Sequence, residues 1–288
     1  MFKKKIVIGT ANFGKKYGNF TQKEKVKSNE IKNIFNYLNK NKINFLDTAY
    51  DYQNENELEN LKISKWNLIT KIHYRNLKRE NYIINLKKKL GFKKYYGILI
   101  HIKNTNEILN KKNIELFNFL KYLKKKGVTK KIGFSIYEPD HVKLLLKNFK
   151  FNLIQCPINI LDTRLIKNGY LKKLKNKNIE IHARSIFLQG LLLSNLNKIP
   201  KKFSLWKKIS YGWENYLIKK NISKLEYCLD FINNVPEVDK IVVGLNNLNQ
   251  LKETLNILKK IKNKNKKIIN FKFIYKNSTK LIDPRKWN

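Results

Sequence analysis

The sequence predicts an α/β protein with a single-domain (β/α)8 TIM barrel, and two patterns support this prediction. Short apolar runs, typical of buried parallel strands, alternate with segments whose apolar residues recur every three or four positions, as in amphipathic helices. Eight such strands lie between residues 6 and 258, with no linker rich in Pro, Gly or Ser among them. This regular alternation favours a closed barrel over an open sheet or two domains.

The predicted strands cover residues 6–8, 44–46, 66–70, 96–100, 131–134, 153–156, 180–183 and 240–243. The segments between them carry apolar residues on one helical face: Ile31, Ile34, Phe35 and Leu38; Ile83, Leu86 and Leu90; Leu116, Phe119, Leu120 and Leu123; 144–146; Leu171 and Leu174; Leu225, Leu229 and Ile232; and Leu251, Leu255 and Leu258. Such a face is what a helix buries against a sheet.

We assign residues 1–260 to the barrel and residues 261–288 to a C-terminal tail of the same domain, with a connection rich in Lys and Asn followed by an extended segment. The one long predicted connection, residues 188–215, follows the seventh strand. Its aromatic residues Trp206, Tyr211 and Trp213 have two interpretations that the sequence leaves open. They either line a substrate pocket or cover apolar surface.

The net charge of +41, from 62 Lys and Arg against 21 Asp and Glu, suggests a nucleic-acid partner at first sight. However, only five of the basic residues are Arg, the residue best suited to grip phosphates and base edges. The lysines are spread along the whole chain, which also holds many Asn, Ile, Phe and Tyr residues. Because all these residues share A/T-rich codons, we interpret the charge mainly as codon bias and predict no specific nucleic-acid partner.

Other features narrow the class of protein. Two cysteines, Cys156 and Cys228, are too few and too far apart for a disulfide-rich scaffold or a CxxC site. No apolar run reaches the roughly 18 residues of a membrane helix, and the N-terminal apolar run is too short for a signal peptide. No spacing of His, Asp and Glu suggests a metal site. We therefore expect a cytoplasmic protein without a membrane partner.

In a barrel of this kind, catalytic groups lie at the carboxyl ends of the strands. Asp47, Lys71 and His101 end or follow three consecutive predicted strands, and Tyr52 follows Asp47 by five residues. These four residue types suit proton donation to a carbonyl group. A free Tyr has a pKa of about 10, so we expect a neighbouring Lys71 ammonium, held by Asp47, to lower the pKa of Tyr52. His101 would orient the substrate oxygen by hydrogen bonding.

The chain resembles the aldo/keto reductases over residues 6–258. The resemblance rests on the ordered segments IGTANFG, FLDTAYDY, ITK, ILIH, KKIGFSIYEP, IQCPINILDTRLI, IHARSIFLQGLLL and VVGLNNLNQLKE. It implies NAD(P)H-dependent reduction of an aldehyde or ketone, with Asp47, Tyr52, Lys71 and His101 as the catalytic tetrad and Tyr52 as the general acid. The second half looks most like bacterial members that act on sugar-related carbonyls.

The same resemblance implies how the cofactor is held. Ser135 and Gln155 match residues that bond the nicotinamide carboxamide, Ile136 stands where an Asn is usual, and Arg184 replaces an aromatic residue that stacks on the ring. The implied cofactor-binding residues are Gly9, Thr10, Ser135, Gln155, Arg184, Ser185, Gly244, Asn246, Gln250 and Glu253. Family frequency favours NADP, with NAD as the alternative because Gly244 and Gln250 carry no charge.

The predicted partner is thus a small-molecule carbonyl substrate, and the oligomeric state stays open. Two other classes of function remain as alternatives. One is a cofactor-binding barrel that acts as a non-catalytic partner or regulatory subunit, and the other is a nucleic-acid binder that depends on the lysines.

Overall fold

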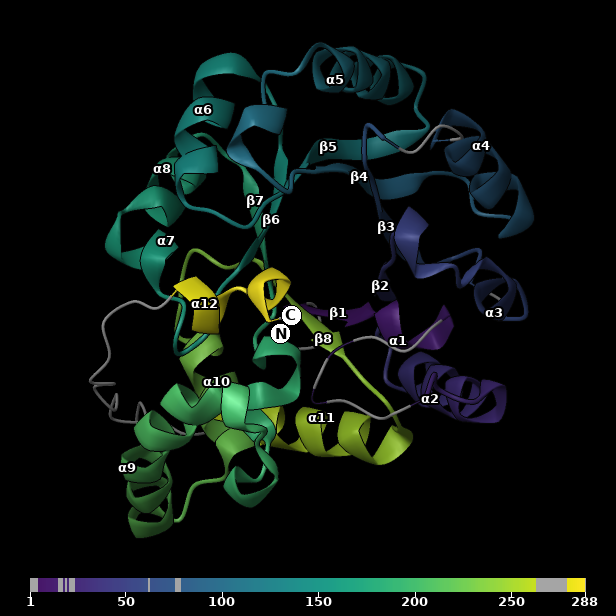
Figure 1. Ribbon diagram of the computed structural model, residues 1–288. Helices are drawn as coiled ribbons and strands as arrows, with labels where there is room; N and C mark the ends of the chain where they lie inside the picture. Colours follow the sequence, from purple (N-terminus) through teal and green to yellow (C-terminus); the bar gives the residue numbers. More distant parts are fainter. Residues whose placement is uncertain are drawn as a thin grey trace.

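A computed structural model describes residues 5–14, 18, 20, 24–61, 63–75, 79–262 and 279–287 of the chain. Eight parallel strands form a closed barrel in the order of the sequence, and β1 pairs with β8 to close it (Figure 1). The strands are β1 (Ile6–Gly9), β2 (Phe45–Asp47), β3 (Asn67–Ile72), β4 (Tyr95–His101), β5 (Thr129–Ser135), β6 (Leu153–Pro157), β7 (Glu180–Arg184) and β8 (Lys240–Gly244).

All eight predicted strands are present, and the barrel fold is confirmed. Each strand ends one or two residues later than the apolar runs predict. The reason is that the polar residues at the carboxyl ends still pair in the sheet, as Gly9 does with Asp47 and His101 with Ser135. Eight of the predicted site residues therefore lie on the strands themselves: Gly9, Asp47, Lys71, His101, Ser135, Gln155, Arg184 and Gly244. Tyr52, Gln250 and Glu253 lie on the turn η2 and helix α11, and Thr10, Ser185 and Asn246 lie on connections.

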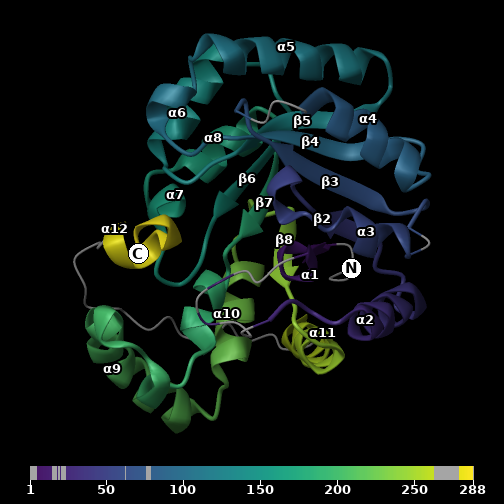
Figure 2. The same ribbon diagram turned by 45° about the vertical axis from the view of Figure 1, so that its right-hand side comes forward.

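Helices surround the barrel on its outside (Figure 2). The longer ones are α2 (Ser28–Lys40), α4 (Arg79–Lys89), α5 (Lys111–Lys125), α6 (Asp140–Asn148), α8 (Tyr170–Asn176), α9 (Ser204–Lys220), α10 (Lys224–Asn233) and α11 (Leu248–Lys262). Short helices are α1 (Ala11–Gly14), α3 (Glu55–Glu59), α7 (Arg164–Lys167) and α12 (Thr279–Ile282). The 3-10 segments are η2 (Tyr50–Tyr52), η3 (Thr105–Glu107), η4 (Leu188–Leu193, kinked at Gln189 and Gly190), η5 (Leu196–Lys198), η6 (Lys201–Phe203) and η7 (Pro284–Lys286).

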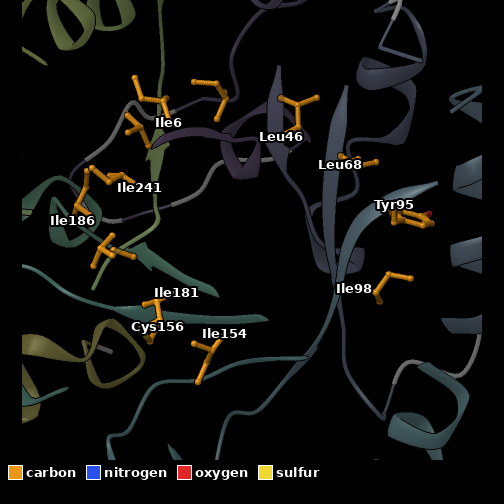
Figure 3. Packing of buried hydrophobic residues seen from close by; sticks show 14 of the residues in the cluster. Ile6, Leu46, Leu68, Tyr95, Ile98, Ile154, Cys156, Ile181, Ile186 and Ile241 are labelled. Carbon is orange, nitrogen blue, oxygen red and sulfur yellow. The ribbon is translucent and has the colours of Figure 1, made fainter. Parts of the chain in front are cut away.

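Side chains alternate along each strand between the helices and the barrel interior, because the side-chain period of a strand is two residues. Ile6 and Ile8 belong to the large apolar cluster that joins strands to helices, whereas Val7 between them belongs to a separate small cluster. Figure 3 shows ten labelled members of the large cluster; nine come from seven of the strands, and Ile186 follows β7. This layer is the main hydrophobic core.

The small cluster fills the barrel interior with Val7, Ile69, Leu99 and Leu153, all fully buried. Two residues further along the same strands, the inward-facing positions are Gly9, Lys71, His101 and Gln155. The alternation that builds the aliphatic layer thus also aims the next residues at the carboxyl end of the barrel. There the interior changes from apolar to polar.

The long connection predicted after the seventh strand contains helical structure. The connection 188–215 includes most of α9, whose Trp206 and Trp213 are buried in a second apolar cluster, whereas Tyr211 is exposed. The buried tryptophans therefore fill apolar space. Trp287 from the tail packs in the same cluster against Phe203, with ring centroids 5.0 Å apart.

The predicted extended tail is wrong for residues 279–287, which form α12 and η7 because Leu281, Ile282 and Trp287 bury their side chains. Residues 263–278 and 288 of that tail lie outside the described residues. In the described part of the chain, every helix is too short or too polar to cross a membrane.

Candidate active site

A buried ion pair lies at the carboxyl ends of β2 and β3. Lys71 Nζ donates to Asp47 Oδ2 at 2.5 Å, and both side chains are 3% exposed. Gln155 Nε2 donates to the other carboxylate oxygen, Oδ1, at 2.8 Å. Asp47 therefore holds Lys71 as the sequence predicts, and both carboxylate oxygens have a donor, which a buried charge requires.

The backbone beneath Asp47 is fixed by a second set of hydrogen bonds. Thr10 donates to the Asp47 carbonyl oxygen through both its amide and its hydroxyl, each at 3.0 Å. Asn54 donates to the Thr10 carbonyl at 2.9 Å and accepts from the Thr48 hydroxyl at 3.0 Å. Thr10 is buried, so it positions Asp47 and lies behind the surface that a ligand would meet.

Tyr52 lies in the turn η2, half-buried, with Lys71 Nζ 5.2 Å from the centre of its ring. Gly14 approaches this turn so closely that an added Cβ would lie 2.1 Å from the Tyr52 carbonyl oxygen. Burial, followed by the charge of Asp47, raises the pKa of Tyr52 well above 10. The expected lowering of this pKa is therefore wrong, because desolvation and the Asp47 carboxylate outweigh the opposing charge of Arg184.

His101 ends β4, half-buried, and its ring stacks on Tyr137 with centroids 5.5 Å apart and an interplanar angle of 18°. His101 Nε2 is 3.2 Å from the Tyr137 hydroxyl. Burial, and then the charges of Arg184 and Lys71, lower the pKa of His101 well below 6.5. The imidazole is therefore neutral near neutral pH and offers one donor and one acceptor.

Tyr137 is also the meeting point of two arginines. The guanidinium carbons of Arg184 and Arg285 lie 4.1 Å and 3.9 Å from the centre of its ring. Arg285 comes from η7 in the tail and donates to the Lys103 carbonyl, two residues beyond His101. The tail thus reaches the end of the barrel at which His101 lies.

Tyr137 and Arg285 are not among the site residues predicted from the sequence. Tyr137 lies two residues after the end of β5, so a search extended past each strand end would have included it. Arg285 has no such signal, because it lies 182 residues along the chain from Lys103, to which it bonds.

A cavity of about 660 Å³ opens beside this constellation. Of the predicted site residues, those that line it are Gly9, Asp47, Tyr52, Gln155, Arg184, Ser185, Gly244, Asn246, Gln250 and Glu253. Those that do not are Thr10, Lys71, His101 and Ser135. Residues that line it and were not predicted include Asn12, Phe20 and Lys224. The cavity therefore runs from Asp47 and Tyr52 to the first half of α11.

Gln155, which lines the cavity, and Ser135, its neighbour in the sheet, fit a nicotinamide carboxamide. Ser135 and Gln155 are register partners on β5 and β6, and both side chains are fully buried. Ser135 Oγ and Gln155 Oε1 have no hydrogen-bond partner among the described residues. A buried polar atom without a partner costs free energy. A carboxamide would satisfy both, because it accepts from a hydroxyl and donates to an amide oxygen.

The outer end of the cavity is ordered by hydrogen bonds within the loop that opens α11. Asn247 Oδ1 accepts from the Gln250 amide, and Gln250 Oε1 accepts from the Asn246 amide, both at 2.9 Å. Asn12 Nδ2 bonds Asn246 Oδ1 at 2.6 Å and so joins this loop to the end of β1. Residues from both ends of the barrel sequence thus form one wall. Over the described ranges, no group of three or more His, Cys, Asp or Glu could hold a metal ion.

Comparisons with known proteins agree with this architecture. The family model described as Aldo/keto reductase family matches residues 5–271. A candidate aldo-keto reductase from Pseudomonas aeruginosa has a similar structure, with a TM-score of 0.66 and 16% identity over 89% of this chain and 90% of that one. An aldo-keto reductase from Bacillus halodurans in its holo form gives a TM-score of 0.67 and 17% identity over 88% and 86%. No curated protein sequence matches the chain.

Proposed function

The chain belongs to the aldo/keto reductase family and is thus an oxidoreductase that acts on carbonyl compounds, and on this basis we propose that it reduces an aldehyde or ketone with NAD(P)H, using Tyr52 as the general acid. One observation supports the proposal most strongly. The buried Asp47–Lys71 pair packs beside Tyr52 at one end of a cavity that also exposes Gln155 and Arg184.

NAD(P)H, when bound, supplies the hydride that the carbonyl carbon takes up. Tyr52 donates its hydroxyl proton to the carbonyl oxygen, and its raised pKa ensures that this proton is present at neutral pH. The Lys71 ammonium, 5.2 Å from the ring centre, stabilises the phenolate that remains. Neutral His101, stacked on Tyr137, orients the carbonyl oxygen by hydrogen bonding.

For the cofactor, we propose that Ser135 and Gln155 hold the carboxamide. Their two buried, unpartnered oxygen atoms support this role. The loop with Gly244 and Asn246, together with Gln250 and Glu253 on α11, would hold the adenosine end. NADP is the first candidate on family frequency and NAD the second. Sugar-related carbonyl compounds are the first substrates to test.

The test is to mix the purified protein with NADPH or NADH and a panel of aldehydes, and to follow the absorbance of the reduced cofactor. Tyr52→Phe should reduce kcat by roughly 10²- to 10⁴-fold, the usual contribution of a general acid. Tyr50→Phe is a matched control, because Tyr50 lies in the same turn and packs edge-on against Tyr82. A Tyr52→Phe variant as active as the parent would contradict the mechanism. Cofactor binding without turnover of any carbonyl would instead support the non-catalytic alternative.

A further inference from the structure

Arg184 is a cation of the cavity wall that lacks a carboxylate partner among the described residues. Its Nη1 donates to Ser185 Oγ at 3.1 Å and its Nη2 to the Ile136 carbonyl at 2.9 Å. Its Nε is buried and has no hydrogen-bond partner within the described ranges. A guanidinium group carries five N–H donors, so these two bonds use fewer than half of them.

The neighbouring arginines are placed differently. Arg164 pairs with Asp162 and Glu138, and Arg285 pairs with Asp283 and Glu138. Both are partly buried. They share Glu138, and each has one further carboxylate, so three carboxylates offset the charges of these two arginines. Arg184 also contacts Tyr137 and is also partly buried, but its hydrogen-bond partners are neutral oxygen atoms.

The two carboxylates that line the cavity do not pair with Arg184. Asp47 lines the cavity, but Lys71 already neutralises it. Glu253 also lines the cavity, but from α11, beyond the end of β8. Arg184 therefore forms no ion pair with a carboxylate in the described part of the chain, and a partly buried cation of this kind gains from an anionic ligand.

Tyr137 and Ile136 hold the guanidinium of Arg184 in place. The guanidinium carbon lies 4.1 Å from the Tyr137 ring centre, and the bond to the Ile136 carbonyl fixes its direction. Since Tyr137 also contacts His101, the same residue sets the positions of the cation and of the group that orients the carbonyl oxygen. A substrate bound to both would present its carbonyl and an anionic group to fixed partners.

We propose that Arg184 binds a carboxylate or phosphate group of the substrate, in place of the stacking on the nicotinamide ring that the family resemblance implies, so that the preferred substrates are aldehydes or ketones that carry such an anion. The proposal rests on the proposed reductase activity for its catalytic consequence, but the anion site itself depends only on the geometry around Arg184. A charge-assisted hydrogen bond of this kind favours the charged substrate by roughly 10- to 100-fold in kcat/KM.

The experiment compares matched substrate pairs that differ in charge. The carboxylate pair is 4-oxobutanoate and butanal, and the phosphate pair is glyceraldehyde 3-phosphate and glyceraldehyde. The measured quantity is the ratio of kcat/KM for the charged and the neutral member, in the parent, in Arg184→Met and in Arg75→Met. Arg75 is exposed and does not line the cavity, so its replacement removes the same charge from elsewhere on the molecule.

The parent should favour the charged member of at least one pair, and Arg184→Met should reduce that ratio at least tenfold, whatever happens to the absolute rates. Arg75→Met should keep the parent's ratio. The pair that responds identifies carboxylate or phosphate as the group recognised. Equal loss of the ratio in both variants would overturn the proposal in favour of general surface charge. An equal fall for charged and neutral substrates, with weaker NADPH binding, would overturn it in favour of a cofactor role alone.

A binding measurement separates this proposal from the reductase proposal. Succinate and inorganic phosphate cannot be reduced, so calorimetric titration with each reports the anion site without turnover. Binding of either anion to the parent but not to Arg184→Met would support the site even if no carbonyl compound were reduced. Activity on neutral aldehydes combined with no binding of either anion would overturn the anion site and leave the reductase proposal intact.

Discussion

The Asp47–Lys71 pair allows a sharp test, because its two members are 3% exposed and charged groups are costly to bury alone. The perturbation is Lys71→Met, which removes the donor to Asp47 Oδ2 and leaves the carboxylate with the Gln155 bond to Oδ1. The second variant, Asp47→Asn with Lys71→Met, removes both charges. The comparison separates the cost of an uncompensated charge from the cost of altered packing.

Breaking a buried ion pair by removing one partner typically costs about 3–5 kcal/mol, whereas replacing both members is often close to neutral. For 288 residues, an unfolding entropy of about 2.1 cal/mol/K per residue gives about 0.6 kcal/mol/K for the chain. Lys71→Met should therefore lower Tm by roughly 5–8 °C. The double variant should recover most of the lost Tm. Both variants should lack reductase activity.

Scanning calorimetry and urea unfolding measure these free energies. Lys25→Met is the control, because the Lys25–Glu57 pair is 2.9 Å long but its lysine is 54% exposed. Exposed pairs contribute only about 0–1 kcal/mol, so the free energy of unfolding of Lys25→Met should lie within about 1 kcal/mol of the parent's. The reasoning is refuted if Lys71→Met is as stable as Lys25→Met, or if the double variant is no more stable than Lys71→Met.

Three further outcomes are expected. Gly14→Ala should reduce kcat by about 10²-fold, as measured by steady-state kinetics on neutral aldehydes. The reason is that the alanine Cβ would lie 2.1 Å from the Tyr52 carbonyl oxygen and would displace the turn η2. The kcat for reduction should not vary with pH between about pH 7 and 9, because the pKa of His101 lies well below 6.5 and that of Tyr52 well above 10. A change of kcat within this pH range that disappears in Tyr52→Phe would contradict this prediction. Burial acts to raise the pKa of Glu180, but hydrogen bonds led by that from His182 outweigh it and hold the pKa at about 2. Since this folded-state pKa is below the unfolded value, the Glu180 carboxylate stabilises the fold above about pH 4.3 and loses this effect as the pH falls toward 2, so the urea midpoint of Glu180→Gln should vary less with pH over that range than the parent's.

Much of the fold follows from local patterns. The apolar strand runs and the helical spacing act over a few residues, so the sequence predicts all eight strands and their order. The position of Asp47 and Lys71 at the ends of adjacent strands also predicts their contact, because consecutive strands of a barrel are neighbours. These features need no knowledge of distant contacts.

Other features depend on contacts between distant parts of the chain. The second apolar cluster turns the connection after β7 into helix α9 and the tail into α12, and no local pattern reports that cluster. The direction of the pKa shift of Tyr52 depends on how deeply its hydroxyl is buried, which spacing does not determine. The placement of Arg285 against Tyr137 likewise depends on where the tail packs.

The arginines of this chain are few, and most of them lie around Tyr137. Only five of the 62 basic residues are Arg, yet three of those five contact this one tyrosine, through its ring or its carbonyl oxygen. A guanidinium offers a planar set of five donors that can stack on a ring and bond several oxygen atoms at once, which an ammonium cannot do. The abundance of lysine hides any single functional lysine among many, whereas each of the few arginines is conspicuous. In sequences of similar composition, the rare arginines are the first positions at which to look for a selected role.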